Sequence, residues 1–288
     1  MFHVAPAPPQ EYHPSMRTRA SIALLLPLAC LLGCTLPNTP HASSPLSGNW
    51  SNWQIQTGTS TIVPPTALTS PPTGTYLVGA MQLQGSQVTG LFQTNAASGG
   101  AGIVNFSGSF DSTTSVLALS STPAYLGVQL TLPANPTNLA TGNMTVGCQP
   151  PPAGGASCNV IALLPAAGAE IAPLNGTYTG TLTDSASPNM SGTGSLTLTQ
   201  STTPNADGSF SLTGTVTFPS NSGLSTDTLS GTISGEGITL YDPTPGIVPV
   251  VSLTASTNPA ATQITVSNLA FAVTASDIVT FTGTLTLQ

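Results

Sequence analysis

The chain of 288 residues contains almost no positive charge. Its only two basic residues, Arg17 and Arg19, lie near the N-terminus, and no Lys or Arg follows them. Proteins bind nucleic acids largely by neutralising phosphates with Lys and Arg, and basic segments are drawn to anionic lipid headgroups by the same charges. The composition therefore excludes nucleic acid as a partner and argues against electrostatic attachment of the body to a membrane.

Histidine is nearly as scarce as lysine and arginine. After His41 the chain has no His, Lys or Arg, so it lacks essential parts of Ser-His-Asp and Cys-His triads, Lys Schiff-base sites, cationic phosphate clamps and His-bearing metal sites. No Gly-rich loop is followed by the Lys of a P-loop. We therefore expect no enzyme activity, no cofactor and no metal site.

Only carboxylate chemistry remains open. Eight carboxylates follow the N-terminal region, and two of them could in principle form the acid/base pair of a glycoside hydrolase. They are scattered, however, and some lie in turn-like settings, so a solvated surface position is expected. The segment Asn205-x-Asp207-Gly208-Ser209 is similar in part to a calcium loop but lacks the later Glu ligand, which favours a simple turn. The eight residues are Asp111, Glu170, Asp184, Asp207, Asp227, Glu236, Asp242 and Asp277.

The N-terminal region has the layout of a secretory signal. Arg17 and Arg19 precede an apolar run of 13 residues, 20–32, which is too short to span about 30 Å of hydrocarbon stably. A basic start followed by a short apolar run and a small residue is typical of a cleaved signal peptide. Residues 1–15 have no role in such a signal, so Met16 is the expected true start.

The run ends in Leu31-Leu32-Gly33-Cys34, which resembles the lipobox of bacterial lipoproteins. The resemblance covers Met16 to about Thr35. It implies cleavage between Gly33 and Cys34, followed by acylation of Cys34. Two or three acyl chains make membrane attachment durable, so the implied partner is the membrane, reached through the anchor. An ordinary secretory signal or an uncleaved anchor are the alternatives.

The same resemblance implies a location in the cell envelope. In that family an Asp after the acylated Cys favours retention at the inner membrane, whereas this chain has Thr35. In a diderm host this implies the outer membrane, with the body in the periplasm or at the cell surface. We expect residues 1–33 to be the signal peptide and the Pro/Ser-rich residues 34–45 to be the lipidated Cys and a flexible tether.

Two cysteines remain for the body. Cys148 and Cys158 are separated by a Pro/Gly-rich segment, and in an oxidising compartment such a pair is expected to form a disulfide. Two zinc thiolates would need two further ligands, and the only mature His, His41, lies in the tether.

Residues after Leu46 alternate between apolar and polar side chains. Leu196 and Leu198 alternate with threonines, as do Leu285 and Leu287. This period of two, interrupted by Gly and Pro, is typical of half-buried antiparallel strands. The fold class expected is all-β: antiparallel up-and-down meander barrels or a β-sandwich.

The body also shows internal similarity, which predicts two related halves, 46–165 and 166–288, of about eight strands each. Three matches occur in the same order at offsets of 128, 123 and 141 residues. They pair Leu46–Trp50 with Leu174–Tyr178, Phe106–Phe110 with Leu229–Ile233, and Thr141–Val146 with Thr282–Leu287. The opening Leu-x-Gly-x-Trp resembles the first strand of avidin-like and lipocalin-like barrels, which implies up-and-down topology and transfers no ligand residue.

The two tryptophans of the chain are the candidate ligand contacts. Trp50 and Trp53 lie three residues apart, so on a strand they face opposite sides and at most one of them enters the core. An exposed Trp near Tyr76 could stack on a sugar or an apolar ligand, although a core Trp with an edge Trp is favoured. The function expected is a non-catalytic, lipid-anchored envelope protein of binding or structural type. The alternatives are a small-ligand carrier with an apolar barrel interior and a carboxylate-dependent glycoside hydrolase.

Overall fold

Antiparallel strands make up nearly all of the described chain. The computed structural model describes residues 46–54, 76–94, 102–122, 126–134, 139–146, 162–184, 186–243, 251–274 and 277–288. The predicted signal peptide, Cys34, the tether, and both Cys148 and Cys158 lie outside these residues. Within them, sixteen strands and two short 3₁₀ turns, η1 (Pro188–Met190) and η2 (Ser220–Ser222), are present.

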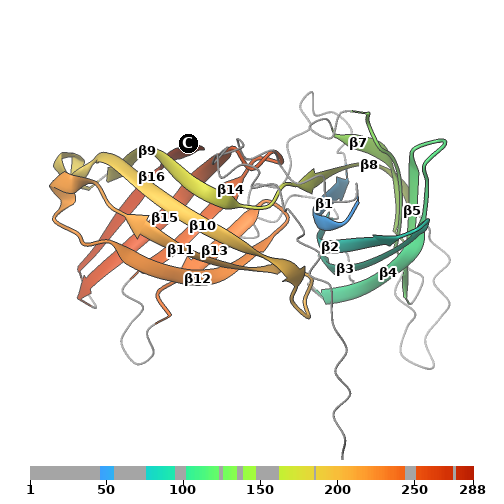
Figure 1. Cartoon of the computed structure of the whole chain (residues 1–288), viewed down its shortest axis with the longest axis horizontal. Coiled ribbons are helices and arrows are strands. Elements are labelled where there is room, and N and C mark those ends of the chain that lie inside the picture. The colour runs from blue at the N-terminus through green and yellow to red at the C-terminus, as the bar shows by residue number, and fades with distance from the viewer. Residues whose placement is uncertain are drawn as a thin grey trace, which may run out of the picture. The chain divides into compact units, whose positions relative to one another are not determined.

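The first eight strands form a closed barrel in which each strand pairs with the next in sequence, and β8 pairs with β1. Figure 1 follows this barrel from blue to green. Its strands are β1 (Gly48–Gln54), β2 (Tyr76–Gln84), β3 (Gln87–Thr94), β4 (Gly102–Asp111), β5 (Val116–Thr122), β6 (Leu126–Thr131), β7 (Ala140–Val146) and β8 (Ala162–Ile171).

The last eight strands repeat this arrangement, and β16 pairs with β9 to close the second barrel. The strands are β9 (Asn175–Asp184), β10 (Gly192–Pro204), β11 (Phe210–Thr217), β12 (Asp227–Ser234), β13 (Gly237–Tyr241), β14 (Val251–Thr257), β15 (Gln263–Thr274) and β16 (Asp277–Leu287). The prediction of an all-β, up-and-down meander is confirmed, and of the two architectures left open the barrel is correct and the sandwich is not.

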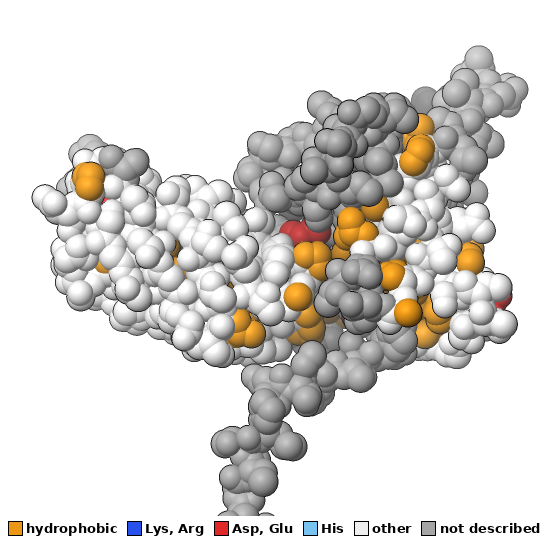
Figure 2. Space-filling view, turned by 90° about the horizontal axis from the view of Figure 1, so that it is seen from above, with side chains coloured by type: hydrophobic (Ala, Val, Ile, Leu, Met, Phe, Trp, Pro, Cys, Tyr) orange, Lys and Arg blue, Asp and Glu red, His pale blue; other side chains and the backbone are white. Residues whose placement is uncertain are grey.

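Alternation of side chains explains why each sheet has an inside and an outside. On β9, Tyr178 and Leu182 are buried while Thr177 and Thr181 are exposed. Because successive side chains point to opposite faces, one set fills the barrel and the other meets solvent. The outside is largely Thr, Ser and Gly. On the face shown in Figure 2, most of the described surface is neither hydrophobic nor charged.

The internal repeat is visible strand by strand. The first match places Trp50 on β1 and Tyr178 on β9, the opening strand of each barrel, and both side chains are buried. The second match falls on β4 and β12, the fourth strand of each barrel. The third pairs β7 with β16, a seventh with an eighth strand, so that match does not reflect equivalent positions.

The change from one barrel to the other comes later than the expected boundary between residues 165 and 166. That boundary falls inside β8, which pairs with β7 and β1 and so belongs to the first barrel. The chain passes to the second barrel through residues 172–174. The second half therefore begins after Ile171.

The two barrels touch through a hairpin turn. The side chain of Asn49 on β1 donates a hydrogen bond from Nδ2 to the carbonyl oxygen of Gly235 (2.8 Å), and the amide of Gly235 donates one to Asn49 Oδ1 (2.8 Å). Gly235 lies in the turn between β12 and β13. Asn49 is buried, so this paired interaction satisfies both ends of its amide away from solvent.

Glycines allow neighbouring strands to approach closely inside the barrels. A Cβ at Gly108 on β4 would overlap the carbonyl oxygen of Ala118 on β5, whereas a Cβ at Gly102, on the same strand, would meet no atom within 4 Å. We predict that Gly108→Ala lowers the free energy of unfolding by about 2 kcal/mol or more, because the backbone must move. Gly102→Ala should change it by less than about 1 kcal/mol. Urea denaturation followed by circular dichroism measures both, and equal effects would contradict the close approach.

Candidate functional site: a pocket in the first barrel

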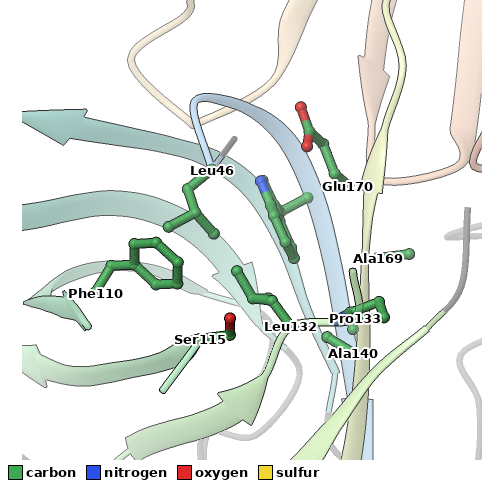
Figure 3. Close-up of a pocket in the computed structure, with 10 residues that line it drawn as sticks. Leu46, Phe110, Ser115, Leu132, Pro133, Ala140, Ala169 and Glu170 are labelled. Atoms are coloured by element: carbon green, nitrogen blue, oxygen red, sulfur yellow. The ribbon is translucent and has the colours of Figure 1, made fainter. Parts of the chain in front are cut away.

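The first barrel contains a pocket with a volume of about 140 Å³. Of the described residues that line it, five are buried and are termed the floor, and five are half-buried and are termed the rim. The floor consists of Leu46, Trp50, Ala140, Gly168 and Ala169, and the rim consists of Phe110, Ser115, Leu132, Pro133 and Glu170. Most of these side chains are apolar, and Glu170 is the single charged one. Figure 3 shows the Glu170 carboxylate at one end, with Ser115 and Leu132 toward the other.

Strand register brings the polar and aromatic groups of the pocket together. Trp50 on β1 is the direct cross-strand partner of Glu170 on β8, and Ala140 on β7 is the partner of Gly168. Directly opposed residues project from the same face with Cβ atoms about 5 Å apart. The indole of Trp50 and the side chain of Glu170 are therefore neighbours on the inner face of the barrel.

Backbone strain is concentrated at this pocket. Leu46 (φ 99°) and Ser115 (φ 57°) are two of the three non-glycine residues with positive φ in the described chain, and both line the pocket. Such conformations cost on the order of 1–3 kcal/mol and tend to gather at ligand sites. Ser115 is held in place because its carbonyl oxygen accepts a hydrogen bond from the amide of Leu132 (2.9 Å), which ties one rim residue to another.

Two polar side chains on the inner face of β1 have no hydrogen-bond partner among the described residues. They are Trp50, through its Nε1–H, and Asn52, through both ends of its amide. The residues are only 3% and 1% exposed. Leaving a buried polar group unpaired costs about 1–3 kcal/mol. A bound molecule or a water inside the first barrel could supply the hydrogen bonds that these side chains lack among the described residues.

The predicted ligand contacts are only partly brought together. Trp50 is a core residue and also lines the pocket; the favoured interpretation, one core Trp and one edge Trp, did not specify which of the two is buried. Trp53 on β1 is the cross-strand partner of Tyr76 on β2. Tyr76 is only 7% exposed and packs with apolar residues of the second barrel, so its ring offers no open stacking surface. Nothing is described of the Trp53 side chain.

Several of the other carboxylates stabilise turns. Asp111 accepts hydrogen bonds from the Thr113 amide and the Thr114 hydroxyl, both at 2.8 Å, and these bonds, the one from Thr114 foremost, lower its pKa. Asp207 accepts from the Ser209 amide (3.0 Å) and hydroxyl (2.6 Å) in the turn between β10 and β11. A turn is present at this position, as predicted.

Glu236 was expected at the surface but is buried. It lies in the turn between β12 and β13 and is 3% exposed. Burial raises its pKa to about 7, although the nearby hydroxyl of Ser51 acts in the opposite direction. Neither carboxylate oxygen has a hydrogen-bond partner of standard geometry among the described residues, and neither does the Ser51 hydroxyl. Ser51 therefore opposes the effect of burial only weakly.

The pocket itself was not predicted from the sequence. Glu170 was counted among the scattered carboxylates, and Phe110, Leu132 and Ala140 were assigned no role. One local signal was present: Glu170 is the only charged residue in the otherwise apolar segment that forms β8. A single acidic residue within a buried strand is unusual enough to mark a candidate position.

Comparison with known proteins gives no match to a family model, a curated protein or a solved structure. Within the described residues, no group of three or more His, Cys, Asp or Glu side chains is placed to hold a metal ion. Among those same residues, no helix is both long and apolar enough to cross a membrane. The pocket therefore has to be interpreted from its own chemistry.

Because the pocket offers free space, we expect two buried alanines, one inside it and one outside it, to differ in how well they tolerate replacement by the larger Val. Ala140 lines the pocket, whereas Ala255 on β14 is buried within the interior of the second barrel. We predict that Ala140→Val changes the free energy of unfolding by less than about 1 kcal/mol, because the added methyl groups enter the pocket. Ala255→Val should cost about 1–3 kcal/mol through overpacking. Thermal and urea denaturation compare the two, and equal losses would mean that the space beside Ala140 is not available.

The raised pKa of Glu236 predicts that the protein becomes less stable as the pH rises. Its folded pKa of about 7 lies above the ordinary value of 4.5. Its contribution to the free energy of unfolding is therefore complete below pH 4.5 and is lost as the pH rises through 7. We expect the protein to be more stable at pH 5 than at pH 8 by up to about 3 kcal/mol. Glu236→Gln should abolish this difference, and the control Asp227→Asn should retain it. A slope that survives in Glu236→Gln would rule out Glu236 as its source.

Proposed function

We propose that this protein is a lipid-anchored, non-catalytic binding protein of the bacterial cell envelope, and that its ligand site is the pocket of the first barrel. The observation that carries this proposal is the strained, mostly apolar pocket beside Trp50, on a barrel face that retains unpaired polar groups. In a protein with a purely structural role, nothing would offset the free-energy cost of the strained backbone and of the unpaired polar groups.

The size of the pocket separates this proposal from a carrier of large ligands. Sites for drug-sized molecules usually have volumes of about 300–1,000 Å³, whereas this pocket has about 140 Å³. A compact molecule, or one end of a longer one, fits this space. The carrier alternative is therefore retained only in the form of a small-ligand site.

The non-catalytic part of the proposal is supported by how the carboxylates are used. Asp111, Asp207 and Asp227 accept hydrogen bonds from neighbouring residues in their own turns or strand ends. Among the described residues that line the pocket, Glu170 is the one carboxylate, whereas glycoside hydrolysis needs two across the scissile bond. A hydrolase is thus less well supported than a binding protein.

The anchoring part of the proposal is supported by the sequence of the leader. Arg17 and Arg19, the short apolar run and the lipobox-like ending occur in the order that export and acylation require. An oxidising compartment also suits a disulfide between Cys148 and Cys158. The absence of Lys and Arg after the leader means that the acyl chains must hold the body at the membrane.

The leader offers a matched pair of cysteines for testing the anchor. We predict that Cys34→Ser abolishes acylation and leaves the protein unprocessed or in the soluble fraction, because the acceptor thiol is lost. Cys30→Ser, which changes a neighbouring thiol in the discarded leader, should still be acylated. Mass spectrometry of the mature N-terminus and membrane fractionation measure both. A wild-type mature N-terminus without lipid on Cys34 would refute the proposal of a lipoprotein.

A further inference from the structure

We propose that the contact between the two barrels is a pH-sensitive device: the turn formed by residues 234–237 stays docked on the first barrel while Glu236 is neutral, and it separates when Glu236 is ionised. This inference goes beyond the proposed binding function and does not depend on the pocket. It rests on three features of the described residues: the fit of the turn to β1 and β2, the hydrogen bonds that hold it there, and a carboxylate that is buried beside them without a partner.

The turn fits closely against the outer face of β1 and β2. Ser51 on β1 and Val78 on β2 are direct cross-strand partners, and a Cβ placed on Gly235 would lie 3.4 Å from Ser51 Cβ and 2.7 Å from Val78 Cγ1. Gly235 has a φ of 55°, a left-handed conformation that favours glycine. Val78 belongs to the same buried apolar cluster as Ile233 and Ile238, which flank the turn. The outer face of the first barrel is therefore part of the core of the second.

Two hydrogen bonds hold the turn on β1. Asn49 donates from Nδ2 to the carbonyl oxygen of Gly235, and the Gly235 amide donates to Asn49 Oδ1, each at 2.8 Å. On the side of the second barrel, the amide of Thr257 donates to the carbonyl oxygen of Glu236 (2.9 Å). Because Asn49 is buried, water replaces the bonds to Gly235 only when the turn moves away. The Gly235 amide therefore reports whether the contact is closed.

The Glu236 carboxylate is buried in this contact without a hydrogen-bond partner. It is 3% exposed, and neither of its oxygens has a partner of standard geometry among the described residues. The hydroxyls of Ser51 and Ser234 are also buried there without partners. An ionised carboxylate in such a place is strongly disfavoured, whereas its neutral form costs much less. Ionisation therefore favours a state in which Glu236 reaches water.

No cationic side chain is available to stabilise the ionised form. No Lys or Arg follows Arg19, and β1 and β14 carry no titratable side chain. The titratable side chains on the other elements around the turn are all carboxylates or tyrosines. They are Tyr76 on β2, Glu170 on β8, Asp207 in the turn between β10 and β11, Asp227 on β12 and Tyr241 on β13. Any of these that ionises is negative and opposes the ionisation of Glu236 further.

The raised pKa of Glu236 gives the sign and the size of the effect. Burial raises this pKa to about 7 in the closed contact, against an ordinary value of 4.5 when the carboxyl reaches water. The contact is therefore most stable below pH 4.5 and weakens as the pH rises through 7. Between pH 5.5 and pH 8.5 the equilibrium constant for opening rises by a factor on the order of thirty. Each barrel is closed by its own strand pairing, so opening leaves both sheets intact.

The test is the hydrogen exchange of the Gly235 amide, followed by NMR on the mature protein between pH 5.5 and pH 8.5 at several low concentrations of urea. The protection factor of this amide removes the intrinsic pH dependence of exchange. We expect the protection factor to fall on the order of thirtyfold over this range. Its dependence on urea should be weaker than that of the most protected amides, because opening the contact exposes less surface than unfolding a barrel does.

Two variants assign the effect to Glu236. Glu236→Gln keeps the size of the side chain but cannot ionise, so the protection factor of its Gly235 amide should change by less than about threefold over the same pH range. Asp227→Asn removes one negative charge from the other end of β12 and should keep the wild-type response. Circular dichroism confirms that each variant is folded.

Three results would overturn the inference. The first is a Gly235 protection factor that stays constant with pH in the wild type. The second is a pH response that survives in Glu236→Gln. The third is a Gly235 amide with the same protection and the same urea dependence as the most protected amides, since the turn would then leave β1 only when the whole protein unfolds. The first and third need only the wild-type protein, so the question is decided even if Glu236→Gln fails to fold.

Discussion

Closure of each sheet on itself is the constraint on which the rest of the structure depends. An open sheet exposes a row of unpaired N–H and C=O groups at each edge, and proteins commonly protect such edges with Lys or other charged side chains. This chain has no Lys or Arg after Arg19 and so lacks the usual protection. Pairing β1 with β8 and β9 with β16 removes the edges altogether. The threonine-rich exterior can then remain uncharged without offering a strand to a neighbour.

Closure also explains why the two related barrels differ inside. An eight-stranded barrel has an interior just large enough to be filled by side chains, so modest differences in side-chain size decide whether space remains. Large residues such as Tyr178, Leu182 and Phe281 are fully buried in the second barrel. The first has Ala140 and Gly168 on its inner face near Trp50. The pocket of the first barrel therefore lies where small residues leave space near Trp50.

The alternation of apolar and polar residues along the sequence was enough to predict the features of the fold that depend on periodicity. Alternation identified the antiparallel strands, and the repeat of Leu46–Trp50 at Leu174–Tyr178 correctly identified the opening strand of each barrel. It failed where residue type is uninformative: the match between Thr141–Val146 and Thr282–Leu287 rests on abundant Thr and Gly and pairs non-equivalent strands. The positions of Glu170 and Glu236 depend on strand register and on a distant hairpin, which no local pattern specifies.

The same lack of cations governs what a carboxylate can do in this fold. A buried carboxylate is costly when no basic side chain accompanies it, so the chain can keep one in only a few ways. Asp111 remains at the surface and accepts hydrogen bonds within its turn. Glu236 is buried, and its pKa rises to about 7, so that it is held more readily in its neutral form. Glu170 is half-buried and lines the pocket of the first barrel.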